Sequence, residues 1–176
     1  MRLGHLAGRF FGALSWRAPA PDDLAWVTSL LTADELAVWS RQPAHDRRHS
    51  VAVARGVEAA LAGTEHADDP RWMEAALLHD VGKVDARLGV LGRVGATLAG
   101  AAAGHDMADA WSQRRGITRR VGLYLRHPEI GADRIRRCGG SEEAARWAAV
   151  HQTPARHAEA GLPAAVVAAL AAADDD

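Results

Sequence analysis

Apolar positions along the chain recur at the three- and four-residue spacing of α-helices, and capping residues divide them into segments. Pro21, followed by two acids, is typical of a helix start, and the helix is expected to reach about Leu31. Thr32 and Glu35 form a capping box that opens a short helix through Trp39. The first part of the chain is therefore predicted to be helical.

The same spacing continues to the end of the sequence. A long helix is predicted from about Asp46 to Leu61, and another begins at Pro70 and ends in the pair His79-Asp80. Further helices are expected in residues 88–103, in 104–126 with a break at Gly116, after Pro128, from Ser141 to His151, and from Pro163 onward.

Composition supports a fold made of helices alone. The chain has 39 alanines and only 5% aromatic residues, and alanine is the strongest helix former. At 176 residues, the sequence predicts a single all-α helical bundle. Residues 1–44 are predicted to form an N-terminal helical extension packed on a domain of residues 45–176.

Charge and cysteine content restrict the class of protein. The net charge of -1 argues against nucleic acid as a partner, because binding to phosphate backbones depends on excess positive charge. The single cysteine, Cys138, cannot form a disulfide within the chain. The chain has no run of about 18 apolar residues, so no membrane-spanning helix is predicted. These features favour a cytoplasmic protein.

Two apolar stripes lack an obvious partner in the sequence. One lies in residues 3–14, and it is predicted to dock on the domain, because Arg2, His5 and Arg9 are few basic groups for an electrostatic membrane anchor. A membrane-surface contact through residues 3–14 is the alternative. The other stripe, in residues 88–102, predicts either a buried helix or a surface that meets another apolar body.

The chemistry is concentrated in residues 75–83, which read AALLHDVGK. An apolar run ends there in His79-Asp80. A metal ion is the usual partner of an imidazole and a carboxylate that lie side by side at the end of a helix. Two other His-Asp pairs, at 45–46 and 105–106, are instead typical of polar helix starts. Lys83 is the only lysine beside 20 arginines, and its compact ammonium suits a phosphate next to a crowded metal site.

Four further motifs of the sequence contain a histidine or an aspartate. They are Arg48-His49-Ser50-Val51-Ala52, His127-Pro128-Glu129-Ile130-Gly131, Ala148-Ala149-Val150-His151 and Leu170-Ala171-Ala172-Ala173-Asp174. Together with His79-Asp80, the motifs resemble those of the HD-domain metal-dependent phosphohydrolases, and the resemblance covers residues 49–174. It implies an HD-domain bundle in which six residues ligate metal: His49, His79, Asp80, His127, His151 and Asp174.

The resemblance also implies a chemistry. One divalent transition metal (Fe, Mn, Co, Ni or Zn) would lie on His49, His79, Asp80 and Asp174, and a second on His127 and His151 with Asp80 bridging. Such a centre would hydrolyse a small phosphorylated substrate, either a nucleotide or another phosphate ester or anhydride. Asp80 and Lys83 are the expected catalytic residues. Lys83 and an arginine, Arg48 or Arg126, are expected to bind the phosphate.

The chain departs from the related HD-GYP group in two places. Where that group has His-His-Glu and Gly-Tyr-Pro, this sequence has Val150-His151-Gln152 and Gly161-Leu162-Pro163. This difference argues against cyclic dinucleotide hydrolysis, and the order of ligands also resembles that of small bacterial dinucleoside-tetraphosphatases. Two alternatives remain open: a non-catalytic HD signalling or ligand-binding module, and a membrane-associated phosphatase acting on a lipid-linked phosphate.

Overall fold

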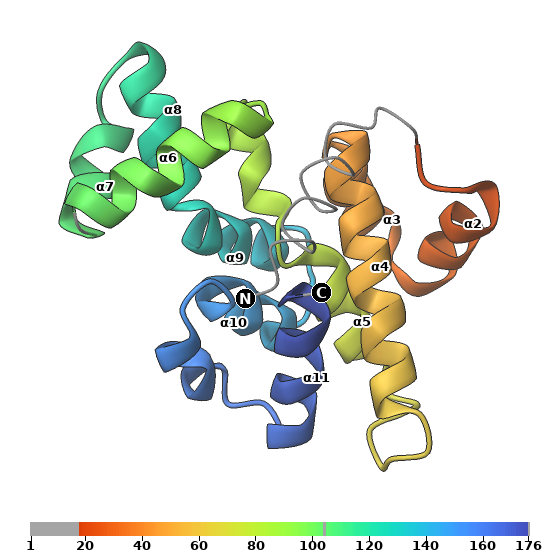
Figure 1. Ribbon diagram of the computed structural model, residues 1–176. Helices are drawn as coiled ribbons and strands as arrows, with labels where there is room; N and C mark the ends of the chain where they lie inside the picture. The colour runs from red at the N-terminus through yellow and green to blue at the C-terminus, as the bar shows by residue number, and fades with distance from the viewer. Residues whose placement is uncertain (1–17, 104, 176) are drawn as a thin grey trace.

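The structure is a computed structural model that describes residues 18–103 and 105–175. Within these ranges the chain forms helices and no strand, which confirms the prediction of an all-α bundle (Figure 1). Among these residues no helix is both long and apolar enough to cross a membrane. The apolar stripe predicted to dock, in residues 3–14, lies outside the described residues.

The first two described helices begin where the sequence predicts. Helix α2 (Pro21–Leu30) has its proline in the first turn, and α3 (Ala33–Ser40) is capped by Thr32. Glu35 Oε2 accepts the Thr32 backbone N–H at 2.7 Å, while Thr32 Oγ1 accepts the Glu35 N–H at 3.4 Å. Val27 and Trp39 are buried in the main core, so residues 18–44 share their packing with the rest of the bundle.

Helices α4 (Ala44–Leu61) and α5 (Pro70–Leu78) form the centre of the bundle. Helix α4 begins two residues before the predicted Asp46, because Pro43 already serves as its N-cap. After α5 the chain continues into a 3-10 helix, η1 (Val81–Ala86), which the sequence pattern did not predict. The α5 side chains are almost all buried, so the residues that follow it are held at the core of the molecule.

Helices α6 (Val90–Ala103), α7 (His105–Ser112) and α8 (Gly116–Leu125) form a lobe to one side of the bundle (Figure 1). A small second core of Ala86, Leu88 and Ala96 joins this lobe to η1. On α6 three large apolar side chains are exposed: Leu91, Val94 and Leu98. Of the two readings of residues 88–102, the structure therefore supports an apolar surface.

The remaining helices complete the bundle. They are α9 (His127–Arg137), α10 (Glu142–Val150), the 3-10 helix η2 (Pro154–Ala160) and α11 (Ala164–Asp175). Ser141 Oγ caps α10 by accepting the Ala144 N–H at 3.1 Å. Helix α11 packs along α4, and α9 packs against both α10 and η1. As a result, the start of α4 and the ends of α5, α10 and α11 meet near the start of α9.

Two buried glutamates lie at the junction of α3, α5 and α10. Glu35 and Glu74 are 4% and 9% exposed, and Glu74 Oε1 accepts the Ser141 backbone N–H at 2.6 Å. Burial raises the pKa of Glu74 to about 7, with the Ser141 contact opposing this shift and the facing Glu35 carboxyl adding to it. The folded protein therefore favours a proton on Glu74.

Glu74→Gln is expected to remove a loss of stability above neutral pH. Because the folded pKa lies above the ordinary value of 4.5, the stability from protonated Glu74 is full below pH 4.5 and is lost as the pH rises through about 7. The variant should therefore match the wild type at about pH 5, and at about pH 8 it should be more stable by about 2–3 kcal/mol. Urea unfolding at both pH values measures this difference.

The control for this experiment is Glu65→Gln, because the Glu65 side chain is 88% exposed. This change should leave the free energy of unfolding alike at both pH values. If Glu74→Gln and the wild type were equally stable at about pH 8, the idea of a retained proton on Glu74 would be wrong.

Candidate metal centre

The structure brings the six residues predicted as ligands into one cluster. His49 lies near the start of α4, His79 and Asp80 follow α5, His127 begins α9, His151 follows α10, and Asp174 is in the last turn of α11. His49 lies in the second turn of α4 and the other five lie at helix ends, and the six side chains project into the same space.

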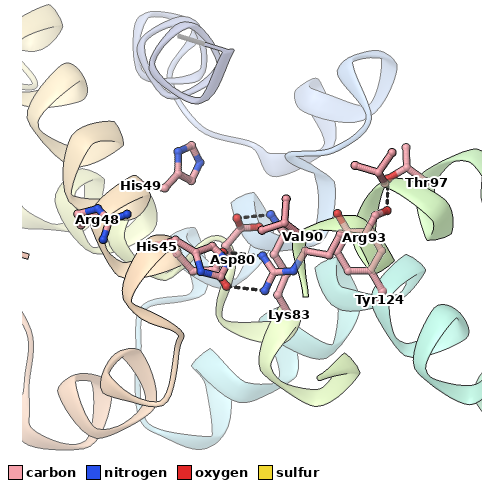
Figure 2. Close-up of a pocket in the computed structure, with 11 residues that line it drawn as sticks. His45, Arg48, His49, Asp80, Lys83, Val90, Arg93, Thr97 and Tyr124 are labelled. Atoms are coloured by element: carbon pink, nitrogen blue, oxygen red, sulfur yellow. Dashed lines mark hydrogen bonds and ion pairs between the residues drawn. The ribbon is translucent and has the colours of Figure 1, made fainter. Parts of the chain in front are cut away.

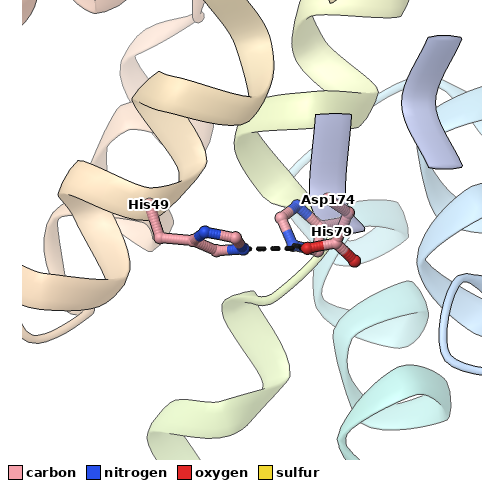
Figure 3. A group of neighbouring side chains, drawn as sticks. All are labelled: His49, His79 and Asp174. Atoms are coloured by element: carbon pink, nitrogen blue, oxygen red, sulfur yellow. Dashed lines mark hydrogen bonds and ion pairs between the residues drawn. The ribbon is translucent and has the colours of Figure 1, made fainter. Parts of the chain in front are cut away.

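The first group of the cluster joins α4, α5 and α11 (Figure 3). His49 Nε2 lies 2.8 Å from Asp174 Oδ1, and His79 Nε2 lies 3.6 Å from the same oxygen. One ligand atom from each of these three residues falls within 4.8 Å of the other two. A single carboxylate oxygen therefore faces two imidazole nitrogens.

The second group is centred on Asp80, which is 1% exposed. Its Oδ1 lies 3.4 Å from His127 Nε2 and 3.3 Å from His151 Nε2. Its Oδ2 lies 3.4 Å from His79 Nε2 and also pairs with the Lys83 ammonium. Because its two oxygens face different histidines, Asp80 connects the two groups.

Three of the histidines are held in the same orientation. In His79, His127 and His151 the Nδ1 atom lies 2.6–2.8 Å from the backbone carbonyl three residues earlier. A carbonyl only accepts hydrogen bonds, so Nδ1 carries the hydrogen in each ring. In the neutral ring, Nε2 then keeps its lone pair, which is the form that binds metals.

The Nε2 atoms of these three rings point at buried carboxylate oxygens. The Nε2 atoms of His79, His127 and His151 and the Oδ1 of Asp80 are all buried and have no hydrogen-bond partner. A neutral imidazole nitrogen and a carboxylate oxygen are both acceptors, and a cation between them satisfies both. Two sets of residues are close enough to hold a metal ion, His49 with His79 and Asp174, and His79 with Asp80 and His151, and their nitrogen and oxygen donors suit a divalent transition metal.

The charges in the cluster also favour the binding of a metal cation. Burial lowers the pKa of His127 to about 4, so its ring is neutral. Burial alone would raise the pKa of Asp80, but Lys83 and His79 hold it well below its usual range. Burial alone would lower the pKa of His79, but the carboxylates of Asp80 and Asp174 raise it to about 10, so a metal would have to displace the proton on Nε2 of this ring. The same negative charge would attract a metal cation.

A cavity of about 390 Å³, here called the metal cavity, opens beside the cluster (Figure 2). Its lining comes from α4, α6, α8 and the segment after α5: His45, Asp46, Arg48, His49, Asp80, Lys83, Val90, Arg93, Val94, Thr97 and Tyr124. Arg48 and Lys83, two of the predicted phosphate-binding residues, are among them. The cavity therefore has cationic side chains next to the candidate ligands.

Arg126, the third predicted phosphate-binding residue, does not line this cavity. Its Nε lies 2.7 Å from Asp109 Oδ1, and its guanidinium also donates to Ser112 Oγ at 3.4 Å. The side chain is thus directed to α7.

Arg93 is the cavity residue that the sequence reasoning missed. Its two terminal nitrogens donate to Asp46 at 2.6 and 2.7 Å, and Asp46 is only 4% exposed. His45 Nε2 lies 3.2 Å from Asp46 Oδ1 and also lines the cavity. The lone charge of Arg93 in the apolar run 88–103 was the feature that could have revealed it, because a buried charge needs a partner.

No protein-family model, no curated protein and no solved structure matches this chain. HD-domain membership stays a prediction from the sequence motifs.

Proposed function

We propose that the protein is a metal-dependent phosphohydrolase of the HD type, acting on a small phosphate ester or anhydride, nucleotides included. The observation that supports the proposal is the set of buried Nε2 atoms of His79, His127 and His151, which face the Asp80 carboxylate without hydrogen bonds. A catalytic metal site needs such a preformed donor set beside a cavity that admits substrate.

In this proposal the two groups of the cluster hold the metal. His49, His79, Asp80 and Asp174 would hold one ion, and His127 and His151 would hold a second, with Asp80 between them. When bound, the metal supplies positive charge for a phosphoryl oxygen and lowers the pKa of water. The fixed Nδ1–H contacts orient the imidazoles, so little reorganisation is needed when the ion binds.

The chain's own residues bind and orient the substrate. Burial alone would lower the pKa of Lys83, but Asp80 raises it, so the ammonium stays charged beside the cavity. Lys83 and Arg48 would neutralise the phosphate. In the reaction, a water oxygen forms a bond to phosphorus while the bond from phosphorus to the leaving oxygen breaks, and the leaving oxygen takes up a proton.

The test is a screen of phosphate esters and anhydrides with Mn, Fe or Co. We expect phosphate release that a chelator stops and added metal restores. Arg48→Ala should lower kcat/KM by about 10- to 100-fold, because a hydrogen bond to a charged group contributes about 1.5–3 kcal/mol. Arg137→Ala, a change on a 79% exposed side chain of α9, is the matched control and should keep activity.

A protein that binds metal but releases phosphate from no compound in the screen would overturn the proposal. That result would favour the non-catalytic HD module, in which the same cluster serves ligand binding without turnover.

A further inference from the structure

A second and larger cavity adjoins the metal cavity. It has a volume of about 740 Å³ and lies between the start of α4, η1 and the first turn of α6. Four residues line both cavities: His45, Lys83, Val90 and Arg93. A molecule with its phosphate near Lys83 can therefore place the rest of its structure in this second space, here called the apolar recess.

The lining of the apolar recess is aliphatic. Its apolar side chains are those of Pro43, Ala44, Val84, Leu88, Val90 and Leu91. Among the described residues that line it, there is no Phe, Tyr or Trp ring and no side-chain carboxylate, amide or hydroxyl; the one ring is the His45 imidazole, which also lines the metal cavity. Proteins commonly bind a nucleobase by stacking on aromatic rings and by hydrogen bonds to the base edges, whereas apart from the His45 ring and the basic side chains this lining offers only aliphatic residues and glycine. A saturated hydrocarbon group needs neither, because burial of its apolar surface is sufficient.

The charged residues around the recess are all basic or histidine. Arg41 and Arg87 line the recess and not the metal cavity, in addition to the residues that line both. Positive charge around an aliphatic lining matches an anionic amphiphile.

The apolar character also continues outward along α6. Leu91 lines the recess and is 73% exposed, and Val94 lines the metal cavity and is 49% exposed. A chain longer than the recess would therefore meet more apolar surface where it leaves.

We propose that the substrate is a phosphate ester of an aliphatic alcohol, with its phosphate in the metal cavity and its hydrocarbon chain in the apolar recess. This inference rests on the phosphohydrolase function proposed above. Water and the alkyl phosphate give the alcohol and inorganic phosphate: the water oxygen bonds to phosphorus, the bond to the alcohol oxygen breaks, and that oxygen takes a proton from the water.

The test is a series of n-alkyl phosphates of increasing chain length, kept below the concentration at which they form micelles. KM should fall by about threefold to fourfold per added methylene until the recess is filled, because each buried methylene contributes about 0.8 kcal/mol. The value of kcat should change little, since the chain binds alike before and during the reaction. AMP is the comparison, and a KM for AMP as low as that of the best alkyl phosphate would overturn the proposal.

Two variants of one helix locate the chain. Leu91 lines the recess, whereas Leu98 is similarly exposed, at 67%, but lines neither cavity. Leu91→Glu should abolish the dependence of KM on chain length, and Leu98→Glu should leave it unchanged. Since both side chains are exposed, both variants should fold. Equal loss of the dependence in both would overturn the assignment to the recess.

A binding measurement separates this inference from the proposed function. Calorimetry with non-hydrolysable n-alkyl phosphonates should show affinity that rises with chain length in the wild type and not in Leu91→Glu. This result without hydrolysis of any phosphate would support the recess and refute the phosphohydrolase. Hydrolysis without any dependence on chain length would refute the recess alone.

The same chemistry can come from a free alkyl phosphate or from a lipid headgroup. Phosphatidylcholine vesicles that contain phosphatidic acid distinguish these sources. Release of phosphate from the vesicles that is lost in Leu91→Glu would support a lipid as the source of the chain. Release that is lost only in Leu98→Glu would overturn the recess as the binding site.

Discussion

Replacement of Asp80 by alanine is expected to remove both the bound metal and the phosphatase activity while the helices stay folded. Asp80 is the residue whose two oxygens face His79 on one side and His127 and His151 on the other. Without it, three imidazoles lose the negative charge that would hold a cation among them. Activity should fall by at least about a thousandfold, since a catalytic metal contributes several kcal/mol to the transition state.

The measurements are phosphate release, metal content by elemental analysis and helix content by circular dichroism. The wild type should contain about two metals per chain if His127 and His151 form the second site, and Asp80→Ala should contain fewer than one. Because alanine leaves Lys83 without its partner, Asp80→Asn is the second variant, which keeps the size of the side chain.

The matched control is Asp85→Asn, a few residues further along. Asp85 pairs with Arg134 and not with the cluster, so its loss should affect neither metal content nor turnover. Full activity in Asp80→Ala would exclude this cluster as the catalytic centre.

Gly82→Ala is expected to destabilise the fold and to disturb the metal centre at the same time. A Cβ atom on Gly82 would lie 2.0 Å from the His127 carbonyl oxygen and 2.7 Å from the Gly131 nitrogen. Both are backbone atoms, so η1 and α9 would have to separate. We expect a loss of about 3 kcal/mol in the free energy of unfolding, which is typical of a strongly overpacked position.

Urea unfolding with and without metal measures this effect. Since Asp80 lies just before η1 and His127 begins α9, separation of the two helices should also weaken metal binding. Gly89→Ala is the control, because a Cβ there would meet no atom within 4 Å, and its stability should change by less than about 1 kcal/mol. Unfolding curves that coincide for Gly82→Ala and the wild type would refute the close contact.

The helices were predictable from the sequence wherever a local cap determines them. Pro21, the Thr32 and Glu35 capping box, and Ser141 each act on the backbone within the next few residues. The 3-10 helix η1 was not predictable in the same way. Its conformation depends on contact with α9, which lies more than forty residues later in the chain.

The candidate site likewise has residues that local sequence motifs reveal and residues that only distant contacts bring together. The six clustered residues could be named because they lie in short motifs that resemble those of HD-domain phosphohydrolases. The Asp46–Arg93 pair could not, because its members are 47 residues apart and meet only when α6 folds against α4. Arg126 was one of two arginines expected at the phosphate, yet its side chain pairs with Asp109 of α7, a contact that the sequence does not reveal.

The contact between His49 and Asp174 joins residues that are 125 positions apart. An ion held by both would act as a cross-link between α4 and α11, much as a disulfide does. Unlike a disulfide, this link is lost when the chain unfolds, so it stabilises by binding to the folded state. At a thousand times its dissociation constant, a metal that binds only the folded chain adds about 4 kcal/mol to stability. The ion proposed for catalysis would therefore also determine how long the protein resists unfolding and proteolysis.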